Sequence, residues 1–119
     1  IDAELEQVEA AAECGFAVCE IHTGPWAHAH AAADGRLDDP AVAAALETVA
    51  AAGRAVLAAG MRFNAGHALN YRNVAPVAAL DGLDELHIGH SIVSRSIFTG
   101  FGPAVAEMHE IVSHAGAKH

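Results

Sequence analysis

Basic residues are scarce in this sequence. Its 119 residues include 6 Lys and Arg against 15 Asp and Glu, which gives a formal net charge of -9 at pH 7. A protein that binds the phosphate backbone of a nucleic acid needs a basic face, and the sequence offers none. An anionic ligand must therefore be held by backbone N–H groups, by the N-terminus of a helix, or by a few placed side chains.

Cysteines and long apolar runs are scarce as well. The spacing of Cys14 and Cys19 matches neither a zinc site nor a redox Cys-x-x-Cys pair, so we expect two small buried residues in a reducing compartment. No uninterrupted apolar run reaches 18 residues, which argues against a membrane-spanning segment. The chain opens at Ile1 without an initiator Met or a basic signal region, and we expect it to be part of a longer protein.

Apolar residues, in contrast, make up 53% of the chain, enough for a folded core. Periodicity and turn residues predict helices over about 3–14, 40–60, 73–80, 91–97 and from 103 onward. They predict strands over about 16–21, 61–64 and 85–88. The segment 26–38 is interpreted as a partly helical excursion. Alternating helices and strands with short connections favour an α/β fold built on a parallel sheet.

Each predicted strand ends in polar residues or glycine, at Glu20–Gly24, Asn64–His67 and His87–His90. The carboxyl ends of parallel strands share one rim of a sheet, so these residues are expected to lie together. Repeated strand–helix units with polar residues at the strand ends indicate part of a (β/α)8 barrel. Such a barrel needs ~200 residues or more, so the single segment 1–119 with three strands cannot close it.

The rim residues suggest two kinds of chemistry. A carboxylate and imidazoles supply groups for acid–base catalysis near neutral pH, which makes Glu20 and His67 candidate catalytic residues. Gly89 and His90 come directly before a predicted helix, whose free N–H groups attract anions. Together with the backbone around Ala68, they form a predicted phosphate cradle.

Each candidate also has a structural interpretation. Glu20 can pair with an interior cation such as Arg62, and a histidine in a strand is often a satisfied core residue. His28 and His30 have the spacing of two metal ligands, but no third ligand lies at a useful spacing, so no metal is expected.

Alternation along the strands predicts which side chains face the barrel interior. Phe63 and Ile88 are expected to face the helices. Arg62 and Glu85 are expected to form a structural ion pair low on neighbouring strands. The predicted interior face contains Arg62, Asn64, Glu85, His87 and Gly89.

Several blocks of the sequence resemble the pyridoxine 5′-phosphate synthase family. The resemblance implies a (β/α)8 TIM barrel with this chain as its C-terminal half, assembled as an octamer in the cytoplasm, without a metal or an organic cofactor. It implies condensation of 3-amino-2-oxopropyl phosphate with 1-deoxy-D-xylulose 5-phosphate to pyridoxine 5′-phosphate, phosphate and water. The matching blocks cover nearly the whole chain: Met61–His67, Leu69–Val74, Glu85–Ile92, Glu20–Gly24, Thr99–Gly100 and Ala104–Met108.

The same resemblance implies roles for individual residues. His67 resembles the catalytic proton donor, and Glu20 resembles the carboxylate that stabilises the transition state. Ala68, Gly89 and His90 resemble contacts to the substrate and its phosphate. The family usually has glycine where this chain has Ala68, and alanine can make the same backbone contact unless the position requires a positive φ.

The resemblance places the other catalytic residues in an N-terminal half, so the 119 residues alone are expected to be inactive. Two other interpretations remain open. The chain can be a non-catalytic phosphate-binding or assembly module, a half-barrel that dimerises. It can also belong to a different phosphate-binding barrel that uses the same last two loops.

Overall fold

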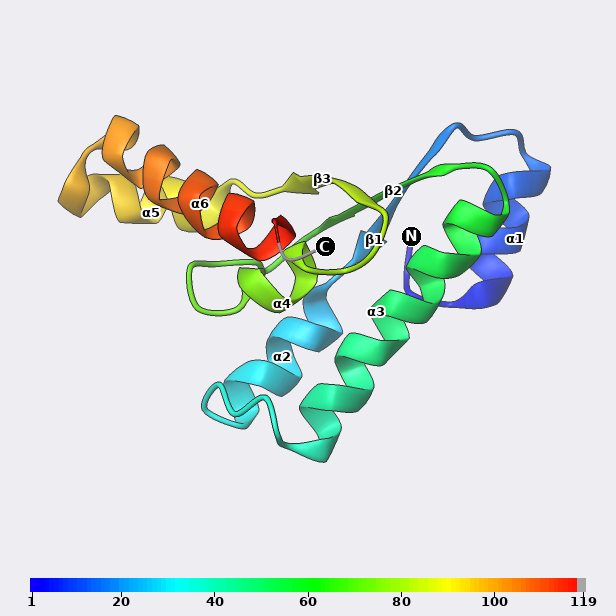
Figure 1. The fold of residues 1–119 in the computed structure, drawn as a ribbon, viewed down its shortest axis with the longest axis horizontal. Helices are drawn as coiled ribbons and strands as arrows, with labels where there is room; N and C mark the ends of the chain where they lie inside the picture. The colour runs from blue at the N-terminus through cyan, green and yellow to red at the C-terminus, as the bar shows by residue number, and fades with distance from the viewer. Residues whose placement is uncertain (118–119) are drawn as a thin grey trace.

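Three parallel strands form the centre of the structure, a computed structural model that describes residues 1–117 (Figure 1). They are β1 (Val18–His22), β2 (Arg62–Gly66) and β3 (Leu83–His87), hydrogen-bonded in the order β1-β2-β3. Each strand lies within about two residues of its predicted position. The predicted α/β class and the parallel pairing are confirmed, and the arrangement is compatible with part of a (β/α)8 barrel.

Six helices accompany the sheet within residues 1–117. α3 (Pro40–Ala58) packs on β1 and β2 and also contacts α1 (Leu5–Glu13) and α2 (Gly24–Ala32). The short α4 (Val74–Ala78) packs against the last helix of the chain. The segment interpreted as an excursion therefore begins with a regular helix, α2.

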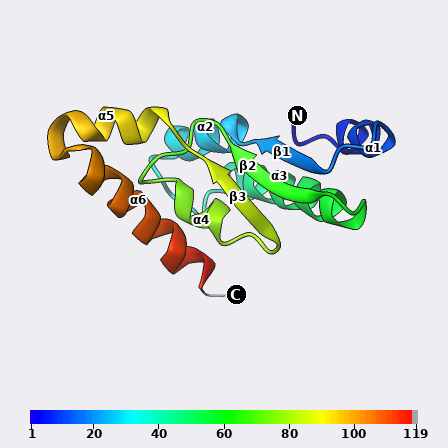
Figure 2. The same ribbon diagram turned by 90° about the horizontal axis from the view of Figure 1, so that it is seen from above.

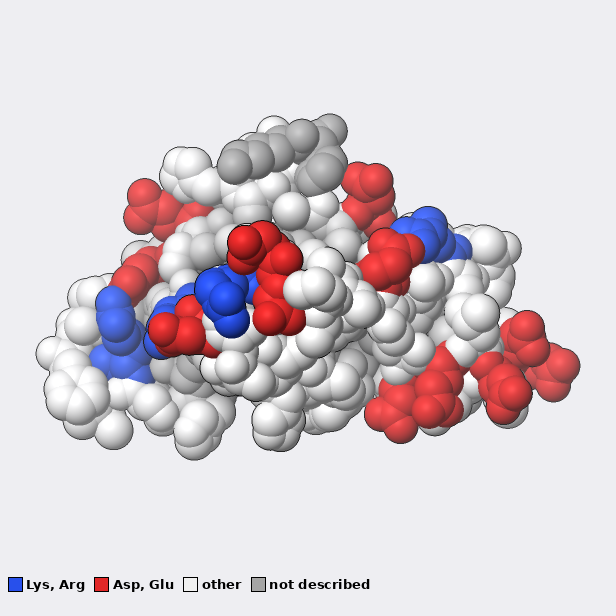
Figure 3. All heavy atoms as spheres, turned by 90° about the horizontal axis from the view of Figure 1, so that it is seen from below, with Lys and Arg blue, Asp and Glu red and all other residues white. Residues whose placement is uncertain are grey.

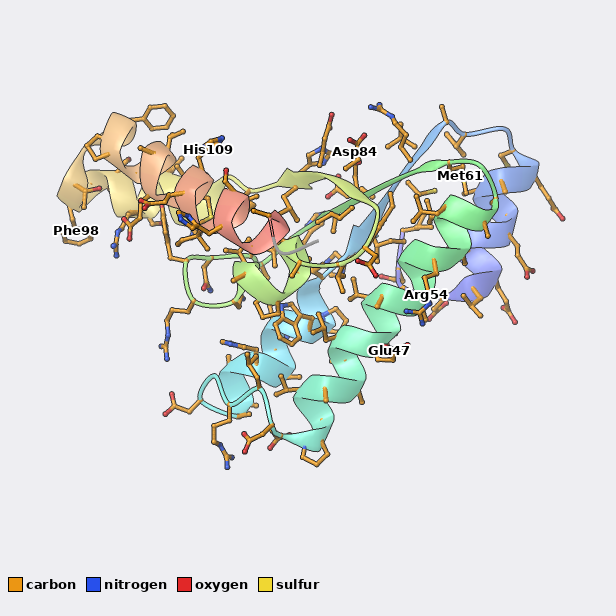
Figure 4. All side chains as sticks on the ribbon, in the orientation of Figure 1. Glu47, Arg54, Met61, Asp84, Phe98 and His109 are labelled. Atoms are coloured by element: carbon orange, nitrogen blue, oxygen red, sulfur yellow. The ribbon has the colours of Figure 1, made fainter. Side chains whose placement is uncertain are left out.

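The last two helices form a hairpin that extends beyond the end of the sheet (Figures 1 and 2). They are α5 (His90–Thr99) and α6 (Phe101–Gly116). Arg95 of α5 donates two hydrogen bonds to the carboxylate of Glu107 of α6, at 3.1 and 2.6 Å. His109 on α6 is exposed, and it points away from the hairpin in Figure 4.

The long helix α3 begins where the sequence predicts. The Asp39 side chain accepts a hydrogen bond from the backbone N–H of Ala41 at 2.9 Å, and Pro40 occupies the first turn. Gly53, in the middle of this helix, lies against the ring of Phe63, and a Cβ at this position would collide with that ring. Glycine therefore lets the helix and the sheet approach closely. The buried residues of α3 are Val42, Val49, Ala52, Gly53 and Val56.

Within residues 1–117, α3 is also the one helix long and apolar enough to cross a membrane by length and composition, with a mean hydropathy of 1.5. The sequence shows no long apolar run here, because the charged residues Glu47 and Arg54 interrupt the apolar sequence of the helix. These two residues form an ion pair, with Nη2 and Oε1 2.5 Å apart (Figure 4). Only 28% of the apolar window of α3 is buried, as a stripe that packs on the sheet, which is typical of an amphipathic helix on the surface of a globular core.

Side chains alternate between the two faces of the sheet. Ile21, Phe63 and Ala65 are buried toward the helices. Glu20 and His87 lie on the other face, which faces the viewer in Figure 2 with α3 behind the strands. The predicted inward and outward faces are therefore confirmed for the strand residues.

Two details differ from the sequence predictions. Cys19 is buried, but Cys14 is exposed, because it caps the end of α1 just before Gly15 (φ +79°) turns the chain away. In β3, Leu83 pairs with Phe63 whereas Glu85 pairs with Asn64, so Asp84 is an extra bulged residue.

The bulge changes the partner of Arg62. Its guanidinium lies 3.1 Å from the carboxylate of Asp84 and 4.0 Å from that of Glu85, so the predicted pair with Glu85 is the weaker contact. Asp84 points away from the helices in Figure 4. Glu85 is thereby left to interact with the site described below.

Charged groups are scattered over the surface. On the face seen from below in Figure 3, the few basic side chains lie beside acidic ones. Among the residues described, this face therefore carries no continuous basic surface.

Candidate active site

Glu20 occupies the centre of the rim formed by the strand ends. It lies in β1, opposite Asn64 of β2, and its side chain is about one-third exposed, at 32%. A Cβ on Gly66, the last residue of β2, would collide with Oε1 of Glu20. Glycine at this position therefore lets the carboxylate pass across the neighbouring strand toward β3.

His87, the last residue of β3, binds the Glu20 carboxylate most closely. Its Nδ1 lies 2.5 Å from Oε2 of Glu20, and its Nε2 lies 3.4 Å from Oε2 of Glu85. Each ring nitrogen thus faces a carboxylate oxygen, and the protonated ring, an imidazolium, can donate an N–H to both carboxylates. The hydrogen bond to Glu20, and then that to Glu85, raises the pKa of His87 above its ordinary value.

His67 lies on the other side of Glu20. Its Nε2 is 3.5 Å from Oε1 of Glu20, and its ring packs against that of His22, with the ring centroids 4.6 Å apart. The side chain is exposed at the mouth of the rim. The two oxygens of one carboxylate thus face two different histidines.

The backbone that carries His67 is held by Thr23. The buried Thr23 hydroxyl lies 2.6 Å from the carbonyl oxygens of both Gly66 and His67, and the Thr23 N–H donates to the Gly66 carbonyl at 2.8 Å. These bonds tie the end of β1 to the end of β2. His67 and Ala68 both have positive φ, at 79° and 57°, a conformation that costs a side-chain-bearing residue energy.

Alanine can replace the family's glycine without strain only where φ is negative. Ala68 has a positive φ, so alanine is strained at this position. The Ala68 carbonyl accepts a hydrogen bond from Nδ2 of Asn73 at 3.1 Å, which helps to fix this turn. The Ala68 side chain itself is exposed.

The third strand end leads into a helix. α5 begins at His90, one residue before the predicted Ser91, and Gly89 is its N-cap without a side-chain cap. Ser91 does not cap the helix, because its hydroxyl donates to the Leu69 carbonyl at 2.9 Å. That bond holds the N-terminus of α5 beside the loop after β2.

The predicted site residues come together in one groove of about 760 Å³. Glu20, His67, Ala68, Gly89 and His90 all line it. The groove also includes His87, to which the sequence interpretation gave an inward position but no role. The pattern Glu85-x-His87 on the interior face was the signal that could have identified it.

The His28 and His30 pair does not form a cluster. His28 is exposed on α2, whereas His30 is buried with its ring 5.3 Å from that of Trp26, centroid to centroid. Within residues 1–117, no three His, Cys, Asp or Glu side chains are grouped so that they could hold a metal ion.

Comparison with known proteins identifies the family. The model of the family described as "Pyridoxal phosphate biosynthesis protein PdxJ" matches residues 1–114. A protein of Azoarcus sp. (strain BH72), named pyridoxine 5′-phosphate synthase, is 56% identical over 117 residues, which are 98% of this chain and 47% of that protein. Proteins of the same name from Aromatoleum aromaticum and Rhodopirellula baltica are 59% and 49% identical, over 97% and 94% of the chain.

The chain covers 46% of the Aromatoleum protein and 42% of the Rhodopirellula protein, so it spans about half the length of the curated relatives it matches. The match to the family model extends over all three strand ends and the groove between them. The chain therefore belongs to the PdxJ family of pyridoxal phosphate biosynthesis proteins.

Proposed function

We propose that this chain supplies the C-terminal half of a (β/α)8 barrel that acts as a pyridoxine 5′-phosphate synthase. The reaction condenses 3-amino-2-oxopropyl phosphate with 1-deoxy-D-xylulose 5-phosphate and releases phosphate and water. One observation carries the proposal: the Glu20 carboxylate lies between two histidines at the rim, beside the N-terminus of α5. The names of the relatives support the same activity.

In this proposal His67 donates protons during imine formation, phosphate loss and dehydration. Its exposed ring at the mouth of the groove is available to a bound substrate, and a histidine is suited to proton transfer near neutral pH. The Glu20 carboxylate stabilises positive charge that develops on the reacting nitrogen. The strained backbone at His67 fits such a role, because strain of this kind gathers at functional sites.

The phosphate group is proposed to bind at the start of α5. Gly89 precedes the helix without a side chain, and the first N–H groups of the ten-residue helix are free to donate. His90 adds a side-chain donor, and Ala68 lines the same groove. This arrangement suits a phosphate in a protein with a formal net charge of -9, because it does not depend on clustered Lys or Arg.

The complete enzyme requires more than these residues. Within residues 1–117, β1 and β3 form the two edges of the sheet, and neither has a further partner strand. At the end of the α5–α6 hairpin, Ile97 is 78% exposed and Phe98 is 87% exposed (Figure 4). We propose that further strands complete the barrel, that copies assemble, up to the octamer implied by the resemblance, and that the enzyme acts in the cytoplasm.

A synthesis assay on the complete protein that carries this chain tests the proposal. We expect pyridoxine 5′-phosphate to form from the two phosphorylated substrates, and replacing His67 by Asn to reduce kcat by roughly 10²-fold or more. KM for the aminoketone phosphate should change little, because the proposed phosphate contacts lie elsewhere. His109→Asn, on the exposed side of α6, is the matched control and should keep full activity.

The outcomes separate the alternatives. If the complete protein binds phosphate but makes no product, the non-catalytic half-barrel is favoured and the synthase proposal fails. If His67→Asn raises KM and spares kcat, His67 binds substrate rather than donating protons. An intact mass near 12.2 kDa would show that a half-length chain exists by itself.

A further inference from the structure

His87 has no part in the roles proposed above, yet it makes the closest contact to Glu20. Its Nδ1 is 2.5 Å from Oε2 of Glu20, whereas His67 lies 3.5 Å from Oε1. The contact with His87 is the shorter of the two, and charge-assisted hydrogen bonds are shorter than neutral ones. Glu20 is therefore held more closely on the side of β3 than on the side of His67.

His87 is itself held in place. Its Nε2 lies 3.4 Å from Oε2 of Glu85, and the same oxygen accepts a hydrogen bond from Nδ2 of Asn64 at 3.2 Å. Arg62 lies closer to the bulged Asp84, at 3.1 Å, than to Oε1 of Glu85, at 4.0 Å, so Oε2 of Glu85 is left to His87 and Asn64. A continuous line of contacts thus runs from Asn64 through Glu85 and His87 to Glu20.

We infer that His87 is a positioning residue for the synthase reaction: its imidazolium, held by Glu85, fixes the Glu20 carboxylate in the orientation that presents Oε1 to His67 and the substrate. The inference rests on the proposed function and deepens it. His87 need not touch the substrate, because it acts through Glu20.

The physical reason lies in the freedom of a glutamate side chain. An exposed glutamate samples several rotamers, and ordering it costs entropy each time the reaction needs it in place. A bound imidazolium removes that freedom before the substrate arrives, which is the condition under which a fixed charge stabilises a transition state efficiently. Gly66 permits the geometry, because any Cβ there would displace the carboxylate.

The test compares His87→Ala and His87→Asn in the complete protein. The asparagine Nδ2 takes roughly the place of the histidine Nδ1 and can donate to Glu20, whereas alanine cannot. We expect His87→Ala to lower kcat by about 10- to 100-fold, the effect of losing one hydrogen bond to a charged group, with KM for both substrates changed by less than about threefold. His87→Asn should recover most of kcat.

Two outcomes would overturn the inference. One is a His87→Ala variant with the kcat of the unaltered protein. The other is a His87→Asn variant no faster than the alanine variant. If the unaltered protein makes no pyridoxine 5′-phosphate, the proposed function itself fails. This failure can be told apart from a failure of the His87 inference, because it appears before any substitution is made. His109→Ala serves as the control for general effects of losing a histidine.

Discussion

Replacing Ala68 by Gly should stabilise the protein, although the change only removes a methyl group. Ala68 has a φ of 57°, in the left-handed region, and its side chain is exposed. The substitution therefore removes almost no buried apolar contact. The Ala68 carbonyl keeps its hydrogen bond from Asn73, because that bond involves only the backbone of residue 68.

The magnitude follows from two opposing terms. An L-residue in the left-handed region costs about 1–2 kcal/mol relative to glycine. Glycine gives the unfolded chain more freedom, which opposes the gain by about 0.4–1 kcal/mol. The central values give a net stabilisation of about 0.8 kcal/mol, which corresponds to a rise in Tm of about 2–3 °C for a protein of roughly twice this length.

Thermal unfolding and urea titration of the complete protein measure the effect. The urea midpoint should rise with an unchanged m value. The matched control is Ala44→Gly, an exposed alanine within the regular helix α3, which should lose about 1 kcal/mol. The same chemical change should thus raise the free energy of unfolding at position 68 and lower it at position 44. A neutral or destabilising Ala68→Gly, beside the expected loss at Ala44, would refute the assigned backbone strain.

Two further predictions concern the carboxylate at the centre of the site. Gly66→Ala places a Cβ against Oε1 of Glu20, so we expect kcat of the complete protein to fall by about tenfold or more. Unchanged kinetics would contradict the position of the Glu20 side chain across Gly66 of β2. The pKa of His87 is raised, so the stability that His87 contributes should be full below the ordinary value of 6.5 and should disappear as pH rises through the folded-state pKa. The Tm difference between the unaltered protein and His87→Ala should therefore shrink with rising pH, and an NMR titration of His87 at or below 6.5 would disprove the assignment.

Much of the fold could be predicted because the signals were local. The Asp39-Pro40 pair marked the start of α3, and each strand lay within about two residues of its prediction. The bulge at Asp84 was not predictable, because it depends on how β3 aligns with β2 rather than on β3 alone. It redirected Arg62 and changed the expected ion pair.

The site also combines features that the sequence predicted with features that depend on how the strands align. Placing polar groups at the ends of parallel strands was enough to bring Glu20, His67 and His90 to one groove. Alternation placed His87 on the interior face without indicating its partner. Its contact with Glu20 joins residues 67 positions apart, and only the register of three strands brings them within 2.5 Å.

By itself, the sequence determined the family, the α/β class, the parallel order of elements and the residues that gather at the rim, since periodicity, caps and strand-end motifs are encoded within short windows. Only the tertiary structure decided which of these residues contact one another. It placed the two oxygens of Glu20 against different histidines and put Ala68 in a left-handed turn. These features depend on how chain segments pack together: the register of the strands, the passage of the Glu20 side chain over Gly66, and the backbone φ of the turn. They cannot be predicted from any one segment alone.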